Sequence, residues 1–285
     1  MALLIAAPLG LVESVFSWGL PLHYSVHRPL NNVYLSIKSD AKPPLRPVIT
    51  MEDNGEAEFR QWLDCKLANA PNADMYAALY SDAADAIVQW RRRYRGSPRL
   101  WRSVFKAERV LKELVETAPV IASVRSVVAS MPKDERCTIV DLASGKGYLS
   151  MFLSEMLPSE RIERCFLVDK AWPAHDWEGP IASHHISDEH IYESREGTGE
   201  SYFTTWPIAL HTSKQNLKNR ATLRSMQRHV FSRSSGPILI LAIHLCGTLA
   251  LRAVDLFNEN PKQVKLLALK PCAPPPSAAR RTLAC

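Results

Sequence analysis

The spacing of hydrophobic and polar residues divides the chain into two parts with different patterns. Between residues 56 and 128, apolar residues recur every three or four positions, which predicts amphipathic helices. After residue 136, short runs of apolar residues alternate with amphipathic stretches. The runs predict strands at residues 137–142, 165–169, 206–210, 237–243 and 264–269, and the stretches predict helices at residues 148–157, 217–231 and 248–257.

Strands that are apolar throughout and alternate with helices are typical of a parallel sheet that helices cover on both faces. We therefore predict an α/β fold with a Rossmann-like, doubly wound, mostly parallel sheet whose five strands have the order 3-2-1-4-5. An N-terminal helical extension precedes this sheet. Pro119 interrupts the helical pattern that begins near Leu100, so we expect the helix to break there.

Composition suggests where the domain boundaries lie. Residues 1–50 contain six prolines and only two acidic residues, so we expect a poorly ordered extension there. Residues 51–99 are expected to form a helical region, residues 100–272 the α/β domain, and residues 273–285 a disordered tail. The long connection at residues 170–205 is interpreted as either a functional flap or a flexible insert.

The overall composition, 46% apolar and 22% charged, excludes wholesale disorder. The longest apolar stretch, residues 1–12, is interrupted by Pro8 and Gly10 and is too short to span a membrane. The six cysteines form no CxxC pair, which argues against a zinc ribbon or a disulfide framework. We expect a soluble, cytoplasmic protein, and organellar targeting by the first 50 residues is the alternative.

The net charge of +6 is concentrated in one block, because residues 201–254 contain seven lysines and arginines and no acidic residue. Arg220, Arg224 and Arg228 recur every four residues, which places them on one side of a helix. A second basic cluster, at residues 91–95, falls at the end of a predicted helix. Each cluster is interpreted either as a solvated helix surface or as a surface that binds RNA.

The segment DLASGKGYLS, residues 141–150, places a glycine-rich turn between the first strand and a helix. Gly145 and Gly147 allow the backbone to approach a ligand closely at the helix N-terminus. A dinucleotide would favour a third glycine, but Ser150 stands there. S-adenosylmethionine instead requires a carboxylate at the end of the strand, which Asp141 provides.

A second acidic residue, Asp169, closes the second strand 24 residues after Gly145. Its carboxylate is placed to accept hydrogen bonds from the ribose hydroxyls of either cofactor, and the alternative is a cap of a helix or turn. The combined spacing favours S-adenosylmethionine. The candidate cofactor-binding residues are Asp141, Ala143, Ser144, Gly145, Gly147 and Asp169.

Four segments together resemble one branch of the class I S-adenosylmethionine-dependent methyltransferases: DLASGKGYLS, FLVDK (166–170), HLCG (244–247) and LKPC (269–272). This branch includes the tRNA acceptor-stem ribose methyltransferases and related methyltransferase-like proteins. The resemblance covers residues 100–272 and implies a Rossmann-like fold, an S-adenosylmethionine site on the first two strands, and an acceptor cleft over HLCG.

The sequence departs from this family at both ends. Relatives continue after KPC with a second cysteine, a helix and two further strands, whereas here Ala273 and three prolines follow. We therefore expect residues 264–269 to form an uncovered apolar sheet edge, caused by truncation or covered by a partner. The cysteine–histidine zinc modules of the tRNA enzymes are also absent from the sequence, which argues against the same substrate.

Methyl transfer to a hydroxyl or amine requires a group that takes up the acceptor's proton. His244 is the candidate base, and the alternative is a buried histidine bonded to backbone. Cys246 is a candidate nucleophile for carbon methylation. Lys270 is expected either to meet a substrate phosphate or to extend into solvent.

Two further features of the sequence bear on ligands. The histidines and aspartate at residues 175, 184, 185, 188 and 190 are spaced too irregularly for a metal site, and we predict a polar loop and no metal. After the predicted third strand, where residues 211–214 stand, there is no acidic or amide residue to bind adenine.

We therefore predict an S-adenosylmethionine-dependent methyltransferase that acts on RNA, with tRNA as one candidate. The alternatives are a methyltransferase for small molecules or proteins, a methyltransferase-like interaction protein without catalytic activity, and a nicotinamide oxidoreductase. The last would share Gly145 and Asp169 but would leave Asp141 without a purpose.

Overall fold

A computed structural model of the 285-residue chain describes residues 2–6, 16–17, 20–21, 55–174, 184–192, 206–245 and 247–270. The helices are α1 (Gly55–Ala68), α2 (Ala77–Arg93), α3 (Pro98–Val104), α4 (Arg109–Ser130), α5 (Tyr148–Met156), α6 (Arg220–His229) and α7 (Thr248–Glu259). The strands are β1 (Ala2–Ala6), β2 (Phe16–Ser17), β3 (Leu20–Pro21), β4 (Cys137–Leu142), β5 (Ile162–Asp169), β6 (Leu210–Lys214), β7 (Ile238–Ile243) and β8 (Val264–Lys270).

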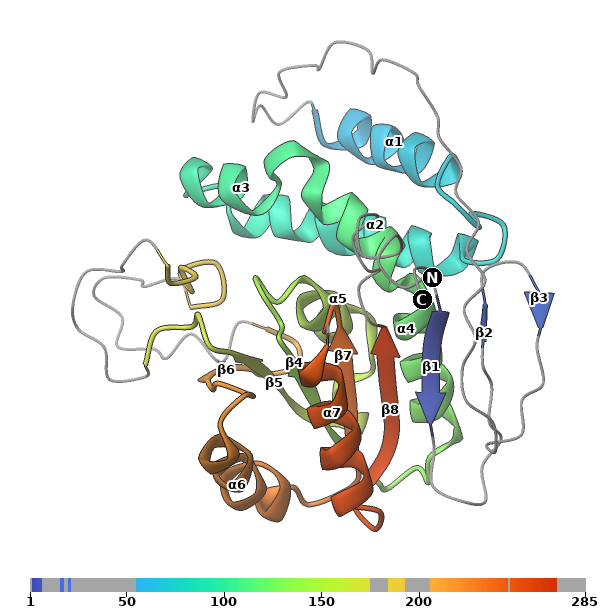
Figure 1. The fold of residues 1–285 in the computed structure, drawn as a ribbon. Helices are drawn as coiled ribbons and strands as arrows, with labels where there is room; N and C mark the ends of the chain where they lie inside the picture. The colour runs from blue at the N-terminus through green and yellow to red at the C-terminus, as the bar shows by residue number, and fades with distance from the viewer. Residues whose placement is uncertain are drawn as a thin grey trace, which may run out of the picture.

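The centre of the molecule is a sheet of five parallel strands in the spatial order β6-β5-β4-β7-β8 (Figure 1). Numbered along the chain, this order is 3-2-1-4-5, which confirms the predicted Rossmann-like topology. The register aligns Asp141 of β4 with Leu241 of β7, and Ile243 with Lys270 at the ends of β7 and β8. Because the strands are parallel, their carboxyl ends lie at the same edge of the sheet.

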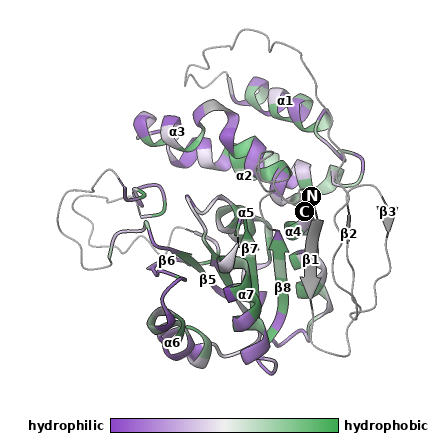
Figure 2. Cartoon of the chain, viewed as in Figure 1, coloured by the Kyte–Doolittle hydropathy of each residue, from purple (hydrophilic) through white to green (hydrophobic). Residues whose placement is uncertain are grey.

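Both faces of the sheet are buried, as the continuously apolar strands predict. Along β7, Leu239, Leu241 and Ile243 pack into one hydrophobic cluster, whereas the alternating residues Ile238, Ile240 and Ala242 pack into the other. Helices α1 to α5 contribute to the first cluster, and α6 and α7 contribute to the second. Figure 2 shows the central strands as mainly hydrophobic. The helical region before the sheet therefore shares one core with it.

The predicted sheet edge at the fifth strand is wrong. Strand β1 pairs antiparallel with β8, with Leu4 opposite Leu269 and Ala6 opposite Leu267. Strands β2 and β3 extend the sheet beyond β1, which gives eight strands in the described part of the chain. An apolar strand with unpaired backbone groups is costly to expose, and the apolar N-terminal segment satisfies those groups. The rest of the predicted extension lies outside the described residues.

The third strand also differs from the prediction, because it spans Leu210–Lys214 and not residues 206–210. Trp206 and Ile208 before it are buried, and the backbone of Ile208 bonds to a side chain, although the carbonyl of Ala209 already accepts from the N–H of Cys165 on β5 at 2.9 Å. The Ser154 hydroxyl accepts from the N–H of Ile208 at 3.0 Å and donates to its carbonyl at 2.8 Å. Hydrophobicity alone does not distinguish this buried, irregular stretch from a strand.

Pro119 does not break its helix, since α4 runs from Arg109 to Ser130 with the proline inside. A proline removes one helical N–H donor, but the helix on both sides of it is held by packing. Its residues Leu114, Ala118, Val120, Ile121 and Val124 are completely buried. Tertiary packing therefore outweighs the local cost of the proline.

Among the described residues, no helix combines the length and apolar character that crossing a membrane would require.

Candidate functional site

The glycine-rich turn connects β4 to α5 at the carboxyl edge of the sheet. Three of its residues have positive φ angles: Ala143 (55°), Gly145 (54°) and Gly147 (79°). The N–H of Ser144 donates to the carbonyl of Val168 at 3.1 Å, which ties the turn to β5. A Cβ atom at Gly147 would lie 2.4 Å from Leu167 Cδ2, whereas a Cβ atom at Gly145 would meet nothing within 4 Å. Gly147 is therefore required for packing, and Gly145 borders open space.

Asp169 at the end of β5 is directly connected to this turn. Its Oδ2 accepts a hydrogen bond from the N–H of Gly145 at 3.2 Å, and its Oδ1 accepts one from the N–H of Ala171 at 2.9 Å. The second bond forms a turn of the kind that aspartate often makes with the residue two positions later. Asp169 therefore serves as a turn cap, and its half-buried carboxylate also lies beside Gly145.

Asp141 lies beneath the turn and is only 3% exposed. Its Oδ2 accepts a hydrogen bond from the hydroxyl of Ser150 on α5 at 2.9 Å. Burial raises the pKa of this carboxyl group to about 7, although the bond from Ser150 opposes the shift. The partnership with Ser150 gives Asp141 a structural role, so Asp141 no longer discriminates against a dinucleotide. Its contact with a cofactor stays a prediction.

Described parts of the long insert pack against the turn. The indole Nε1–H of Trp172 donates to Ser144 Oγ at 3.1 Å, and the Trp172 side chain is completely buried. His190 Nε2 lies 2.7 Å from the carbonyl of Lys146, and burial lowers the pKa of His190 to about 4. His190 therefore belongs to the packed structure and not to a polar loop, whereas His184 is exposed and His185 and Asp188 are partly exposed. Residue 175 lies outside the described part of the chain.

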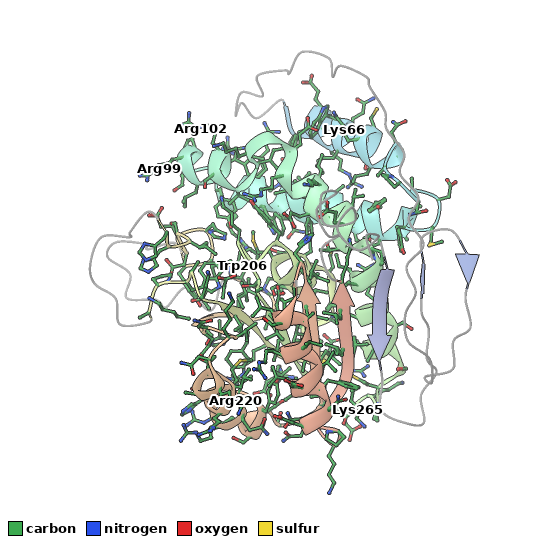
Figure 3. The ribbon with its side chains drawn as sticks, in the orientation of Figure 1. Lys66, Arg99, Arg102, Trp206, Arg220 and Lys265 are labelled. Atoms are coloured by element: carbon green, nitrogen blue, oxygen red, sulfur yellow. The ribbon has the colours of Figure 1, made fainter. Side chains whose placement is uncertain are left out.

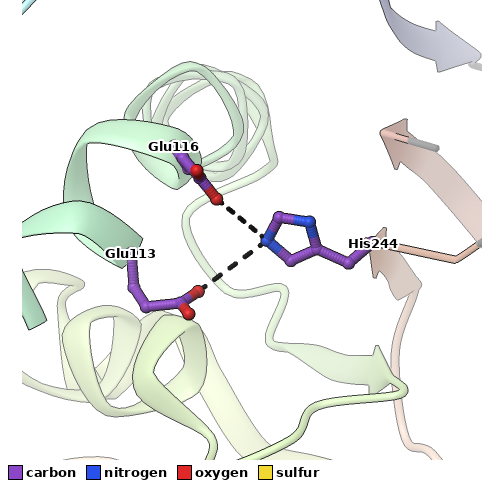
Figure 4. Close-up of side chains that lie close together, drawn as sticks. All are labelled: Glu113, Glu116 and His244. Carbon is purple, nitrogen blue, oxygen red and sulfur yellow. Dashed lines mark ion pairs between the residues drawn. The ribbon is translucent and has the colours of Figure 1, made fainter. Parts of the chain in front are cut away.

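A cluster of ionisable side chains lies at the carboxyl end of β7 (Figure 4). His244 Nε2 is 3.1 Å from Glu116 Oε2 and 3.8 Å from Glu113 Oε2. Both glutamates come from α4. Hydrogen bonding to Glu113 and the negative charges of the two glutamates raise the pKa of His244. His244 has a positive φ angle of 60°, and its N–H donates to the carbonyl of Lys270 at 2.9 Å.

Lys270 does not extend into solvent, and its contact with a substrate phosphate stays a prediction. Its side chain is buried, and its Nζ donates a hydrogen bond to the main-chain carbonyl of Glu116. Burial lowers the pKa of the lysine. The expectation that Lys270 snorkels is therefore wrong, because the residue ties β8 to α4. Cys246 lies outside the described residues, so its proposed role as a nucleophile stays a prediction.

Sequence reasoning missed two groups of polar residues. Glu113 and Glu116 are separated by three positions, which puts them on one side of α4. That spacing was visible, but nothing local indicated that β7 would bring His244 to them. Because β6 spans residues 210–214, the residues that follow the third strand are the amides Gln215 and Asn216. The expectation that no amide follows this strand is therefore wrong.

The basic cluster at residues 91–95 is largely structural. The Arg91 guanidinium donates to the carbonyl of Gly55 and lies over the ring of Phe59. Arg93 pairs with the buried carboxylate of Glu155 at 2.9 Å and lies 3.9 Å from the centre of the Trp206 ring. Arg92 pairs with Glu56 at 2.5 Å. Arg91 and Arg93 are held by neighbouring elements, so the interpretation as a solvated helix end is wrong for them, whereas the Arg92 side chain is 66% exposed and fits it.

The other basic cluster is exposed as predicted. Arg220, Arg224 and Arg228 lie along the surface of α6 and line one groove, of about 940 Å³, together with Arg252 of α7. Asp255 and Glu259 of α7 also line this groove, and Arg252 pairs with Asp255 at 3.0 Å. Figure 3 shows Arg220 near the end of the molecule that contains Lys265 at the start of β8. The groove therefore lies away from the carboxyl edge of the sheet.

Comparisons with family models, with curated proteins and with solved structures find no match to this chain.

Proposed function

We propose that the protein is an S-adenosylmethionine-dependent methyltransferase. The observation that carries the proposal is the hydrogen bond from the N–H of Gly145 to Asp169 Oδ2, beside open space at Gly145. This arrangement puts a close-approach glycine and a carboxylate at neighbouring strand ends, as a nucleoside with two ribose hydroxyls requires. When bound, S-adenosylmethionine would supply an electrophilic methyl group.

The residues present fit such a cofactor. Asp169 accepts one hydrogen bond at each carboxylate oxygen from the backbone, and each oxygen can accept a second from a ribose hydroxyl. Ala143 and Ser144 form the wall of the turn beside Gly145. Gln215 follows β6, and its N–H donates to the carbonyl of Asp169 at 3.1 Å. This bond places Gln215 next to Asp169, where its side-chain amide can recognise adenine.

The acceptor side of the proposed reaction is assigned to His244. Its imidazole accepts the proton that a hydroxyl or amine acceptor loses, and Glu116 Oε2, 3.1 Å from Nε2, positions the ring. The two glutamates lie on the same side of α4, close to His244 Nε2, and their negative charges stabilise the imidazolium that this transfer produces. The base therefore acts as part of a group of three side chains and not alone.

The first experiment is a calorimetric titration with S-adenosylhomocysteine and, separately, with NADH. We expect S-adenosylhomocysteine to bind and NADH not to bind. The Asp169→Ala variant should bind about ten- to a hundredfold more weakly, because ribose hydroxyls lose a partner worth about 1–3 kcal/mol. Asp169→Asn keeps one acceptor oxygen and so one of the two backbone hydrogen bonds, and unfolding measurements on both variants separate this loss from collapse of the turn. Asp134→Ala, in an exposed loop, is the matched control.

NADH binding in place of S-adenosylhomocysteine would overturn the proposal in favour of an oxidoreductase. If neither ligand bound, the interpretation as an interaction protein without catalytic activity would take its place.

We propose RNA as the acceptor, and the support for it is the exposed arginines of α6, which lie away from the carboxyl edge and would hold the backbone of an RNA long enough to reach both places. Each phosphate that an arginine neutralises releases counterions, so binding should weaken steeply as salt rises. Replacement of Arg220, Arg224 and Arg228 by alanine should reduce this salt dependence and leave S-adenosylhomocysteine affinity unchanged. If the wild-type protein shows no salt-sensitive RNA binding, a small-molecule or protein acceptor takes the place of RNA.

A further inference from the structure

Glu113, Glu116 and His244 bring three metal-ligating atoms together from two segments that are far apart in the sequence. One atom from each residue lies within 4.8 Å of the other two. In a metal site the bonds to nitrogen and oxygen ligands are about 2.0–2.2 Å long, so ligands on opposite sides of one ion are about 4 Å apart. The 3.1 and 3.8 Å separations from His244 Nε2 fall within that span. A single ion can therefore contact all three after small side-chain rotations.

The charges around the cluster leave the inward-facing oxygens available. Arg109 lies 3.9 Å from Oε1 of Glu113, and Lys112 lies 3.9 Å from Oε1 of Glu116. Both cations are largely exposed and contact the other oxygen of each carboxylate, and such exposed pairs contribute little energy. Lys270 donates to the main chain of Glu116 and, among the described residues, forms no ion pair with either carboxylate. Among the described residues, the ion pair of each Oε2 atom is the one with the His244 imidazole.

We propose that these three residues bind a divalent first-row transition-metal cation through Glu113 Oε2, Glu116 Oε2 and His244 Nε2. Imidazole favours transition metals, whereas carboxylate is shared with Mg²⁺, Ca²⁺ and Mn²⁺, so the mixed set selects ions such as Mn²⁺ and Zn²⁺. Ca²⁺ prefers six to eight oxygen ligands, which these residues do not supply. The side chains are 25–42% exposed, which leaves room for further ligands on the solvent side.

Cation binding does not rest on the proposed cofactor site, because none of the three ligands belongs to the turn at Gly145. The consequence of cation binding for the reaction does rest on the proposed function. A cation with open positions can bind an acceptor hydroxyl and lower the pKa of that hydroxyl, whose proton then passes to water. His244 would then hold the cation, and the cation would take over the task assigned above to the imidazole.

The test is a titration of chelator-treated, full-length protein with Mn²⁺, with free Mn²⁺ measured by electron paramagnetic resonance. We expect one site per chain, displaced by Zn²⁺ and not by Ca²⁺. Glu113→Gln, Glu116→Gln and His244→Gln should each weaken binding by about tenfold or more, since even loss of an outer partner of a ligand costs about 10- to 100-fold. Glu259→Gln, at the exposed end of α7, is the matched control and should bind like wild type.

Equal Mn²⁺ binding by wild type and the three variants would overturn the proposal, as would a wild-type protein that binds no Mn²⁺. In the second case the imidazole and the glutamates form an ion pair only. Circular dichroism verifies that each variant is folded. Asp169→Ala distinguishes the two proposals, because it should lose S-adenosylhomocysteine and keep Mn²⁺. A protein that binds S-adenosylhomocysteine but not Mn²⁺ would retain the proposed function and lose this inference.

Discussion

The two halves of the sheet's carboxyl edge are built in different ways. At β4 and β5 the backbone forms the surface, because the turn at Gly145 is fixed by hydrogen bonds to β5 and by Asp141 buried beneath it. At β7 and β8 the surface consists of ionisable side chains, since Glu113 and Glu116 of α4 and His244 after β7 are partly exposed. The first half is rigid and shaped for close approach. The second can rearrange around a charged group.

This difference separates the residues that stabilise the fold from those that are available to a ligand. A buried network loses stability when one member is removed, whereas half-exposed ion pairs contribute little to it. Substitutions in the first half should therefore change the free energy of unfolding. Substitutions in the second half should change ligand binding and leave the fold intact.

The largest effect concerns the pH dependence of stability through Asp141. Its pKa is raised to about 7 in the folded protein, and an unfolded aspartate titrates near 3.9. Between these values the folded state keeps a proton that the unfolded chain has lost, so stability should fall as pH rises, by on the order of 4 kcal/mol in total. Asp141→Asn, whose amide oxygen still accepts from Ser150, should remove this slope.

Guanidinium unfolding at pH 5 and pH 8 measures the part of the effect between pH 5 and the folded pKa, roughly 3 kcal/mol. The exposed Asp134→Asn variant is the control and should keep the wild-type slope. An Asp141→Asn variant with an unchanged slope would contradict the assignment of the buried proton to this residue.

The second prediction is that Gly147→Ala destabilises the protein by about 3 kcal/mol. The new Cβ would approach Leu167 Cδ2 to 2.4 Å, and Leu167 is completely buried and cannot move away without disturbing the core. The positive φ of 79° adds backbone strain. Denaturant unfolding measures the loss. Wild-type stability in this variant would show that the turn adapts and is not rigid.

The third prediction compares Gly145 with Gly147. Gly145→Ala should cost only about 1 kcal/mol, since its Cβ meets no atom within 4 Å and only the φ of 54° opposes it. The methyl group would occupy the space proposed for the cofactor, so S-adenosylhomocysteine affinity should fall about tenfold or more. Calorimetry measures the loss of affinity, and denaturant unfolding of the same samples measures the loss of stability. Unchanged affinity would place the ligand elsewhere.

The sequence allowed the first half of the edge to be predicted much better than the second. The turn at Gly145 and the acid at Asp169 follow their own strands directly, so local pattern located both. Glu113 and His244 meet only after α4 packs against β7, and no local signal encodes that contact. The same reason explains the two errors in the predicted sheet. The Ser154 side chain hydrogen-bonds the backbone of Ile208 before the third strand, and β1 covers the edge at β8.

The smallest expected effect is on the stability of the second half. The double variant Glu113→Gln, Glu116→Gln should differ from wild type by less than about 1 kcal/mol in metal-free buffer, because the pairs with His244 are partly exposed. The substitution also relieves repulsion between two neighbouring carboxylates, which offsets the lost attraction to His244. Unfolding midpoints in the presence of a chelator measure this difference. With Mn²⁺ added, wild type should gain stability by mass action and the double variant should not. A large loss of stability without metal would show that the glutamates hold α4 to β7, and the contrast between the two halves of the edge would no longer stand.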